Sequence, residues 1–245
     1  MNNVDRLREI VNNPTVKIVF FGGAGVSTES GIPDFRSKDG LYNQKYKYPP
    51  EYMLSKECLV HKPKEFFKFY REKLDVRNFE PNVVHKRLAE LEAQGKVLGI
   101  VTQNIDGLHQ KAGSKNVIEI HGTTKRNYCM KCGKEFSSDY IFENTDEIPR
   151  CDNEKCKNVG MVRPDVVLYD ERIKAWSDAC KLISSANVLI IGGTSLTVQP
   201  ACNLIYEFCG EHIIIINKGE ITLPLLNPDS DFVIDDYLGN VFSQI

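Results

Sequence analysis

The chain has 245 residues, of which 42% are hydrophobic and 26% are charged, and its formal net charge is −2. This length and composition suit one large α/β domain, alone or with a smaller insertion. The near-zero net charge excludes a global basic field that would draw the protein to nucleic acid or to an anionic membrane.

The start of the chain and the cysteine content bear on its location. The first eight residues are polar and charged, and no apolar stretch approaches the length of a membrane span. We therefore expect a cytoplasmic protein. In a cytoplasmic chain of this size, the eight cysteines favour metal binding or burial over disulfides.

Six short segments rich in Val and Ile are typical of buried parallel strands. They are Val16–Phe21, Val97–Thr102, Val117–Ile120, Val188–Ile191, Ile213–Ile216 and Phe232–Ile234. Helices are predicted between strands, several with proline at the start or glycine just past the end. They are Pro81–Gln94, Ile173–Ser184 and Pro200–Phe208. This alternation predicts an α/β fold with a doubly wound, Rossmann-like parallel sheet.

Two stretches are too long for ordinary connections between strands and helices. The first is rich in aromatic residues and has a predicted helix near Lys64–Leu74, and the second carries cysteines. We interpret residues 33–79 and 122–164 as two insertions that build a smaller domain, helical in one part and a zinc ribbon in the other. The large domain then comprises residues 1–32, 80–121 and 165–245.

The second insertion contains the pairs Cys129-x-x-Cys132 and Cys151-x₄-Cys156. Four thiolates close a tetrahedral shell around Zn²⁺ and leave no open position, which predicts one structural zinc ion. The alternatives are four unrelated buried cysteines or a redox-active pair, and a redox pair normally begins a βαβ helix. The other cysteines have no such spacing and are expected to be small buried hydrophobic residues: Cys58, Cys180, Cys202 and Cys209.

Two glycine turns follow predicted strands and suggest a dinucleotide site. Gly23 and Gly25 fit the first two glycines of the G-x-G-x-x-G fingerprint, but Thr28 occupies the third position and Pro33 leaves no room for a long helix. We expect backbone N–H groups of the turn Gly22–Gly25 to face a diphosphate. The second turn begins at Gly192, and the alternative for it is an ordinary βα loop. Together the turns suit a ligand crevice at a switch point of the sheet.

Polar residues follow two more strands. The segment Thr102–His109 carries amides and a carboxylate, and His121 with Gly122 follows the next strand. A histidine at the carboxyl end of a strand is placed for proton chemistry near neutral pH. His109 stays undecided at this point. The remaining histidines are interpreted as structural: His61, His85 and His212.

These segments resemble the motifs of sirtuins, the NAD-dependent protein deacylases. Residues 23–36, GAGVSTESGIPDFR, resemble the signature of the family, and residues 102–109, TQNIDGLH, resemble its second motif. His121-Gly122 resembles the catalytic His-Gly, and the four cysteines match the zinc ribbon in position and order. The resemblance spans nearly the whole chain. It implies that the segment after the first turn is a loop that closes over nicotinamide, where a long helix would be in the way.

The resemblance implies a role for each matching residue. His121 would be the general base, and Asn104 would orient the ribose and an ordered water. Residues implied to contact NAD near its reacting end are Ala24, Thr28, Phe35, Arg36, Gln103, Ile105 and Asp106. Phe35 would shield the ribose carbon from water, and Asp106 would take the carboxamide. Residues implied to hold the adenosine half are Gly193, Thr194, Ser195, Asn217 and Asp236.

The resemblance also implies where the substrate binds. An acetylated peptide would add as a strand along Val166, Val167, Leu168 and Tyr169. Asp170 replaces a glycine that the family usually has at the next position, which bears on peptide preference. Sirtuins that remove acidic acyl groups resemble one another in carrying a Tyr and an Arg on the helix that lines the acyl pocket. Phe67 and Tyr70 occupy these two positions here, so we expect a small, uncharged acyl group.

The implied activity is NAD-dependent deacetylation of protein lysine, with nicotinamide and O-acetyl-ADP-ribose as products. Acetylated proteins or peptides are the expected partners, and nucleic acid and membranes are not. One alternative is protein ADP-ribosylation with the same cofactor. Another is a non-enzymatic zinc-ribbon scaffold or nucleic-acid-binding protein. A dehydrogenase is disfavoured, because the third glycine of the fingerprint and a clear acidic residue about 20 residues on are missing.

Overall fold

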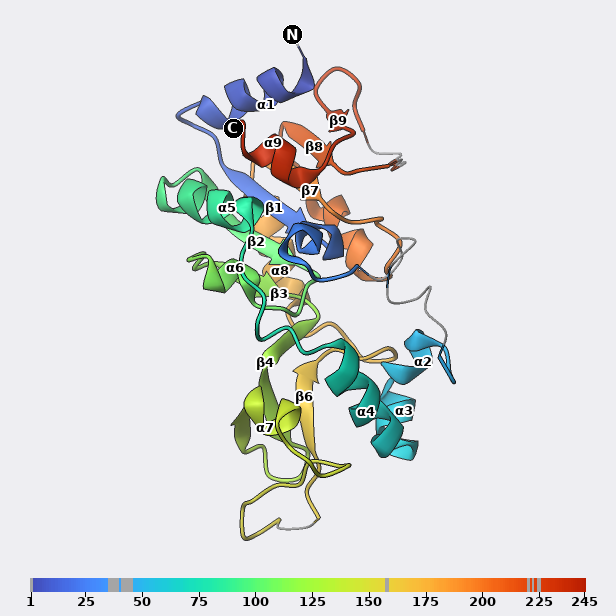
Figure 1. Ribbon diagram of the computed structural model, residues 1–245. Helices are drawn as coiled ribbons and strands as arrows, with labels where there is room; N and C mark the ends of the chain where they lie inside the picture. The colour runs from blue at the N-terminus through green and yellow to red at the C-terminus, as the bar shows by residue number, and fades with distance from the viewer. Residues whose placement is uncertain are drawn as a thin grey trace.

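The computed structural model describes residues 2–34, 40, 46–156, 159–219, 221, 223 and 226–245. A six-stranded sheet and a three-stranded sheet organise the chain, and the two termini lie at the end of the molecule that holds the larger sheet (Figure 1). None of the helices in the described ranges combines the length and the apolar character that crossing a membrane requires.

The large sheet is parallel throughout, with strand order β3-β2-β1-β7-β8-β9. Its strands are β1 (Ile18–Gly22), β2 (Val97–Thr102), β3 (Val117–Glu119), β7 (Val188–Gly192), β8 (His212–Ile216) and β9 (Phe232–Ile234). All six predicted strands are confirmed, with ends that shift by two residues at most. The chain builds outward from β1 in one direction and from β7 in the other. The predicted doubly wound α/β fold is therefore confirmed, with its switch point between β1 and β7.

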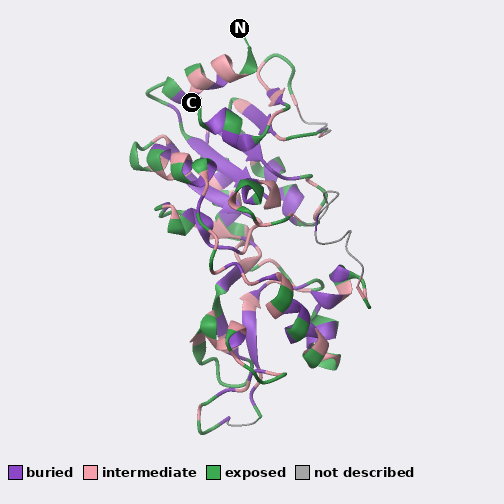
Figure 2. Cartoon of the chain, viewed as in Figure 1, coloured by how far each residue is buried: buried purple, intermediate pink, exposed green. Residues whose placement is uncertain are grey.

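Alternate residues of the strands feed two separate cores, one on each face of the sheet. Ile18 and Phe20 of β1 join the core beneath three helices, whereas Val19 and Phe21 join the core on the opposite face. The three helices over this first core are α1 (Asn3–Asn12), α5 (Val83–Ala93) and α9 (Leu238–Phe242). The opposite face is covered by α8 (Trp176–Ser184) and the 3₁₀ helix η4 (Ala201–Glu207). The central strands of the large sheet are buried and the outer faces of the helices are exposed (Figure 2).

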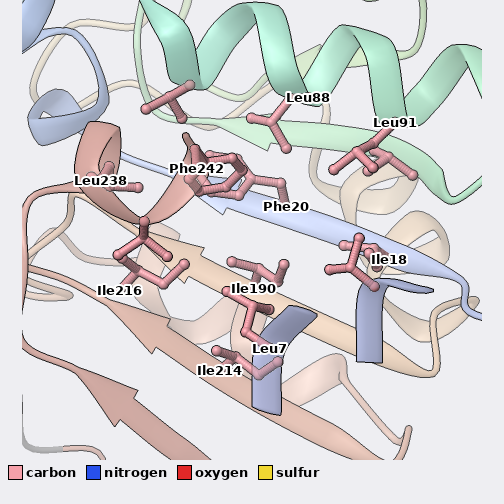
Figure 3. Close-up of a cluster of buried hydrophobic side chains, with 14 of the residues drawn as sticks. Leu7, Ile18, Phe20, Leu88, Leu91, Ile190, Ile214, Ile216, Leu238 and Phe242 are labelled. Carbon is pink, nitrogen blue, oxygen red and sulfur yellow. The ribbon is translucent and has the colours of Figure 1, made fainter. Parts of the chain in front are cut away.

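The first core packs around Phe20, whose ring meets Phe242 of α9 edge-on at 5.8 Å between centroids. Figure 3 shows Leu7 of α1 lying against the same layer of side chains. Helix α1 was not predicted, although Leu7 and Val11 lie one helical turn apart and both are buried. Two other predictions differ in detail: α8 begins at Trp176, and the predicted helix Pro200–Phe208 is a 3₁₀ helix.

The two long insertions pack against each other at the other end of the molecule (Figure 1). The first carries α2 (Pro50–Met53), α3 (Lys56–His61) and α4 (Pro63–Lys73), so the predicted helix near Lys64–Leu74 is confirmed. The second carries the small antiparallel sheet, of order β5-β4-β6, and α7 (Asp139–Phe142). Its strands are β4 (Gly122–Cys129), β5 (Glu135–Ser137) and β6 (Val162–Val166).

Apolar and polar contacts both join the insertions. Tyr70 of α4 stacks on Phe142 of α7 with centroids 5.4 Å apart. Arg71 donates hydrogen bonds to the carbonyl oxygens of Ile141 and Asp146, at 2.8 Å each. These contacts fix the helical insertion against the cysteine-bearing one.

Gly122 stands where the large sheet passes into the small one, directly after His121. Its φ is +78°, and a Cβ there would lie 2.0 Å from the carbonyl oxygen of Asp165 on β6. Only glycine allows the two strands to approach this closely. The junction therefore depends on the absence of one side chain.

We predict that Gly122→Ala destabilises the protein far more than Gly95→Ala. Gly95 also has a positive φ, of +75°, but nothing lies within 4 Å of a Cβ at that position. Both variants incur the left-handed backbone cost of about 1–2 kcal/mol, and only Gly122→Ala adds an overpacking cost of about 1–3 kcal/mol. Urea unfolding of the two variants measures the difference. Equal destabilisation would show that the junction tolerates a side chain.

Candidate active site

The two glycine turns lie in direct contact at the switch point. The Gly23 N–H donates to the Gly192 carbonyl at 3.1 Å, and the Gly25 N–H donates to the Gly193 carbonyl at 2.8 Å. A Cβ on Gly25 would lie 2.8 Å from the Cα of Gly193. The first turn continues as two short 3₁₀ helices, η1 (Ala24–Val26) and η2 (Thr28–Ser30), so no long helix forms there.

This contact corrects one expectation about the first turn. We expected its N–H groups to face a diphosphate, but those of Gly23 and Gly25 are bonded to the second turn. The glycines serve the close approach of two backbones. Ala24, which lies between them, is half-buried, and Thr28 is exposed with its hydroxyl donating to the Gly25 carbonyl.

The loop after β2 is tied to the first turn through a buried serine. The Ser27 hydroxyl donates to Asp106 Oδ2 at 2.7 Å and accepts from Asn104 Nδ2 at 3.1 Å. Ser27 is 2% exposed. No sequence pattern singled out Ser27 as a site residue, although it lies inside the signature segment. The three side chains form one hydrogen-bonded group from two strand ends.

Burial raises the pKa of the Asp106 carboxyl, and hydrogen bonds from the Leu108 N–H and the Ser27 hydroxyl partly oppose this rise. The Leu108 N–H lies 2.8 Å from Oδ1. Ile105, just before Asp106, accepts two hydrogen bonds from Thr124 of β4, from the N–H at 2.9 Å and from the hydroxyl at 3.0 Å. The loop is therefore held from both sides.

His121 lies next to this loop, because its Nδ1 is 3.0 Å from the Gln103 carbonyl oxygen. A carbonyl can only accept, so Nδ1 carries the proton and Nε2 of the neutral ring is the basic nitrogen. Burial lowers the pKa of His121, which keeps the ring neutral at physiological pH. A neutral imidazole with a fixed tautomer can accept a proton through Nε2.

The strand ends beyond the switch point carry the remaining predicted nucleotide contacts. Gln103 Nε2 donates to Thr194 Oγ1 at 3.0 Å, which joins the loop after β2 to the second glycine turn. The Ser195 hydroxyl lies 2.9 Å from that of Thr197. Asn217 follows β8 and Asp236 follows β9, at the same carboxyl edge of the sheet. Phe35 and Arg36 lie outside the described residues.

The predicted peptide-binding segment begins beside His121. The Val167 N–H donates to the His121 carbonyl at 2.8 Å, and the Tyr169 N–H donates to the Leu54 carbonyl at 3.0 Å. Leu168 is buried, and Tyr169 is exposed. Asp170, at the position of the family glycine, has a φ of +71°, so it keeps the left-handed backbone with a charged side chain.

An ion pair between buried Arg163 and half-buried Glu171 holds the bend that follows this segment. Arg163 donates to both carboxylate oxygens of Glu171, at 2.6 and 2.9 Å, and also to the Val166 carbonyl at 2.8 Å. The Leu168 N–H donates to the same carboxylate at 3.0 Å. A planar two-point contact of this kind fixes orientation, so Val166 and Leu168 are held on one side of the bend.

Four cysteines form the predicted metal site. The Sγ atoms of Cys129, Cys132, Cys151 and Cys156 all lie within 4.8 Å of one another, and three of the pairs are 3.4, 3.8 and 3.9 Å apart. A tetrahedral zinc site with Zn–S bonds of about 2.3 Å requires sulfur atoms about 3.8 Å apart. The residues therefore fit a structural Zn²⁺ ion.

The backbone around the cysteines supports thiolates. The N–H groups of Lys131 and Asn153 each point to a cysteine sulfur at 3.4 Å. A Cβ on Gly160 would lie 2.6 Å from the Cys129 Sγ, so this position must be small. None of the eight cysteines, all within the described residues, is in a disulfide. One expectation was wrong: Cys209 is exposed, because it follows η4 on the surface, and Cys180 is half-buried.

His85 and His109 form a buried pair behind the site, with ring centroids 4.7 Å apart. His109 belongs to α6 (Leu108–Lys111), which follows Asp106, and His85 caps the start of α5 together with Asn82. Asn82 Nδ2 donates to the Val26 carbonyl of the first turn at 2.8 Å. Asn82 thus links the start of α5 to the first turn, and His109 is buried next to His85 at 1% exposure. His212 Nδ1 donates to the Ser230 carbonyl, as a structural histidine would.

The fold and these residues define a nucleotide-binding α/β enzyme with a structural metal ribbon. Residues 23–200 match the model of the Sir2 family. The chain is 49% identical to an NAD-dependent protein deacetylase of Clostridium acetobutylicum over 100% of this chain and 98% of the relative. The chain belongs to the Sir2 family.

Solved structures agree with this assignment. One is a Sir2 variant with a deacetylated p53 peptide and 3′-O-acetyl ADP ribose, at a TM-score of 0.85 and 32% identity, covering 99% of this chain and 97% of that one. Another is a mutant Sir2 homologue in complex with ADP ribose, at a TM-score of 0.85 and 34% identity, covering 100% and 94%. At 32% and 34% sequence identity, both structures support membership of the family as well as a shared fold.

We predict that Cys132→Ala releases zinc and unfolds the ribbon, with indirect loss of activity. Three remaining thiolates bind zinc more weakly and leave one coordination position of the ion open. Metal analysis after gel filtration measures zinc per chain, and Cys209→Ala is the matched control because its thiol is exposed and outside the cluster. One zinc still tightly bound per chain of Cys132→Ala would contradict the assignment.

We predict that the free energy of unfolding falls as the pH is lowered from about 6.5 toward 4. Burial lowers the pKa of His85 to about 4 and that of His109 well below its usual value. The unfolded chain therefore binds more protons in this window, which favours unfolding. Urea unfolding at several pH values measures the slope.

Exchanging one histidine of the pair separates its contribution. His109→Gln should make the pH dependence shallower, whatever its effect on absolute stability. His61→Gln, which changes an exposed histidine, should leave the slope unaltered. An unchanged slope in His109→Gln would show that the pair does not control acid stability.

Proposed function

We propose that this chain removes acetyl groups from protein lysine side chains in a reaction that consumes NAD, and that His121 is its general base. The chain is an enzyme of the Sir2 family that uses NAD, and it carries a four-cysteine site for structural zinc. The observation that carries the proposal is the meeting of His121, the Ser27–Asn104–Asp106 group and both glycine turns at one sheet edge.

When bound, NAD would supply the ribose carbon at which nicotinamide is the leaving group and the acyl oxygen of acetyl-lysine is the nucleophile. His121 Nε2 takes a proton from a ribose hydroxyl, since Nδ1 is engaged with the Gln103 carbonyl. One water is consumed as the lysine amine leaves the acyl carbon, so the products are nicotinamide, O-acetyl-ADP-ribose and the free lysine. The name of the Clostridium acetobutylicum relative and the acetyl ADP ribose in a solved neighbour support this chemistry.

The neighbouring residues orient the two ends of NAD. Asp106 takes the nicotinamide carboxamide, and Asn104 orients the ribose and a water, both positioned through Ser27. Phe35 shields the ribose carbon from water. The other nicotinamide-side contacts are Ala24, Thr28, Arg36, Gln103 and Ile105. The adenosine half is bound by Gly193, Thr194, Ser195, Asn217 and Asp236.

The substrate is an acetylated protein segment that lies along residues 166–169. The N–H groups of Val167, Leu168 and Tyr169 are bonded within the chain, so the segment offers the substrate its carbonyl side. Substrate recognition then depends on the Arg163–Glu171 ion pair, which fixes the bend behind this segment. We also propose that residues 1–32, 80–121 and 165–245 form the large NAD-binding domain and that residues 33–79 and 122–164 form the small domain. We also propose a cytoplasmic location, which the lack of disulfides among the eight described cysteines favours, and no nucleic-acid or membrane partner.

Mass spectrometry of an acetyl-lysine peptide incubated with NAD tests the function. The proposal requires loss of the acetyl mass, with one nicotinamide and one O-acetyl-ADP-ribose formed per lysine. Addition of ADP-ribose mass to protein without loss of acetyl groups would favour the ADP-ribosyltransferase alternative. Neither change would favour a scaffold.

We predict that His121→Ala lowers kcat about 100-fold or more while the fold, zinc content and NAD affinity are retained. General acid–base catalysis contributes about 10²–10⁴-fold, and the variant removes only the base. His212→Ala is the control, since His212 lies at the start of β8, at the opposite end of that strand from Asn217. Near-normal turnover by His121→Ala would overturn the assignment of the base.

We predict a strong preference for acetyl-lysine over succinyl-lysine. Phe67 and Tyr70 are fully buried in an apolar cluster, and neither offers a cation to a carboxylate. Arg71, the nearest guanidinium on α4, is engaged with the carbonyls of α7 and its following loop. Burying an unpaired carboxylate would cost several kcal/mol, on the order of the costs known for unpaired buried charges.

The measurement is kcat/KM on matched acetyl and succinyl peptides with saturating NAD. Arg71→Met serves as the control and should leave the ratio of the two values unchanged. A preference for succinyl in the wild type, abolished by Arg71→Met, would show that Arg71 reaches the acyl group after all.

A further inference from the structure

A groove of about 540 Å³ lies between the helical insertion and the loops that carry the cysteines, in the small domain opposite the two termini (Figure 1). It is lined by Val60, Pro63, Met130, Lys131, Arg150 and residues 159–161. Val60, Met130 and Val159 are 49%, 47% and 65% accessible to solvent, although each is a large apolar side chain. Exposed apolar side chains that gather at one place among polar ones are typical of protein-interaction sites.

Backbone hydrogen bonds hold the floor of the groove in place. The Met130 N–H donates to the Met161 carbonyl at 2.9 Å, and the Cys151 N–H donates to the Gly160 carbonyl at 2.8 Å. Arg150 also forms a β-bridge with Met161. The cysteine-bearing loops therefore present a preformed surface, so little ordering of this chain opposes the binding of a partner.

The groove is separate from the sites proposed for the acetylated peptide and for NAD. Ser55, just before α3, forms a β-bridge with Tyr169 of the proposed peptide segment, whereas Val60 lies in the last turn of that helix. In the same way, His121 directly precedes β4, whereas Met130 directly follows its other end. A partner that covers Val60 and Met130 thus binds at the far ends of both elements.

The charges at the groove are positive. Among the described residues that line it, two are cations and none is acidic. Lys131 is exposed and forms no ion pair with another described residue, and Arg150 donates to the Val159 carbonyl at 3.4 Å with one of its five N–H groups. The carboxylate of Glu147 is engaged with Lys64, at 2.5 Å. The groove is therefore complementary to carboxylates that lie beside apolar side chains.

We propose that this groove binds an acidic segment of a partner protein. A large apolar side chain of the partner lies between Val60, Met130 and Val159, and carboxylates next to it pair with Lys131 and Arg150. Methionine and arginine are enriched in protein interfaces, and a few buried apolar anchors usually contribute most of the binding energy. The proposal does not rest on the deacetylase function, because none of these residues belongs to the NAD, peptide or zinc-ligand sets.

Selection of a random peptide library displayed on phage, with the full-length zinc-loaded protein as bait, tests the proposal. Phage that also bind a Val60→Asp variant are removed first, so that the peptides retained depend on the groove. The enriched peptides should combine a large apolar residue with neighbouring Asp or Glu. No enrichment, or a consensus of Lys and Arg, would overturn the proposal.

Fluorescence anisotropy of one enriched peptide then measures the contributions of single side chains. Val60→Ser and Lys131→Glu should each raise its Kd about tenfold, through loss of apolar contact and through repulsion of the carboxylates. The matched controls are Val83→Ser, on α5, and Lys68→Glu, on α4, since both residues are exposed and lie outside the groove.

Both controls should bind the peptide as the wild type does. All four variants should keep the zinc content of the wild type and its rate on a short acetyl-lysine peptide. A wild-type Kd in Val60→Ser or in Lys131→Glu would overturn the proposal. Absence of deacetylation by the wild type would instead count against the proposed function and leave the peptide Kd values as the test of the groove.

Discussion

The close contact between two glycine turns is the constraint on which the rest of the site depends. The turns follow neighbouring strands at the switch point, and two backbone hydrogen bonds join them. This approach is possible because glycines without side chains occupy the contact positions of both turns. A Cβ on Gly23, Gly25 or Gly193 would lie 2.5–2.8 Å from the opposing turn. This approach brings Ser27 and Thr194, which follow the two turns, within reach of the loop after β2. The positions of the side chains in the nucleotide crevice therefore depend on the close contact between the two backbones.

The loop after β2 is connected to the small sheet through Gln103 and His121. Gln103 donates to Thr194 on one side, and its carbonyl fixes the tautomer of His121 on the other. Directly after His121, Gly122 passes the chain into β4, whose far end carries the first zinc ligand, Cys129. The zinc ion thus acts far from the chemistry. It joins the end of β4 to the loop that carries Cys151 and Cys156, and this loop leads through β6 into the segment proposed to bind the peptide.

Much of this arrangement follows from the sequence, because it depends on short, strong patterns. Six buried strands, two glycine turns and four paired cysteines are each local signals, and the strand order then brings their ends together. What the sequence did not reveal depends on contacts between distant segments. Nothing in the sequence distinguishes the Ser27 hydroxyl from others, and only the fold brings it within 2.7 Å of Asp106. The N–H groups of Gly23 and Gly25 are bonded to a turn about 170 residues on, as their partners Gly192 and Gly193 show. Helix α1 was missed because its apolar stripe is short, and Cys209 was misjudged because no local pattern marks exposure.

The most direct test of the contact between the turns is Gly25→Ala, which adds one methyl group between them. If this contact builds the site, ADP-ribose affinity falls at least tenfold and NAD-dependent deacetylation of an acetyl-lysine peptide falls with it. Zinc content and the unfolding transition of the small domain should remain those of the wild type. Wild-type ADP-ribose affinity and turnover in Gly25→Ala would contradict this conclusion, because the contact between the turns would then be dispensable for the site.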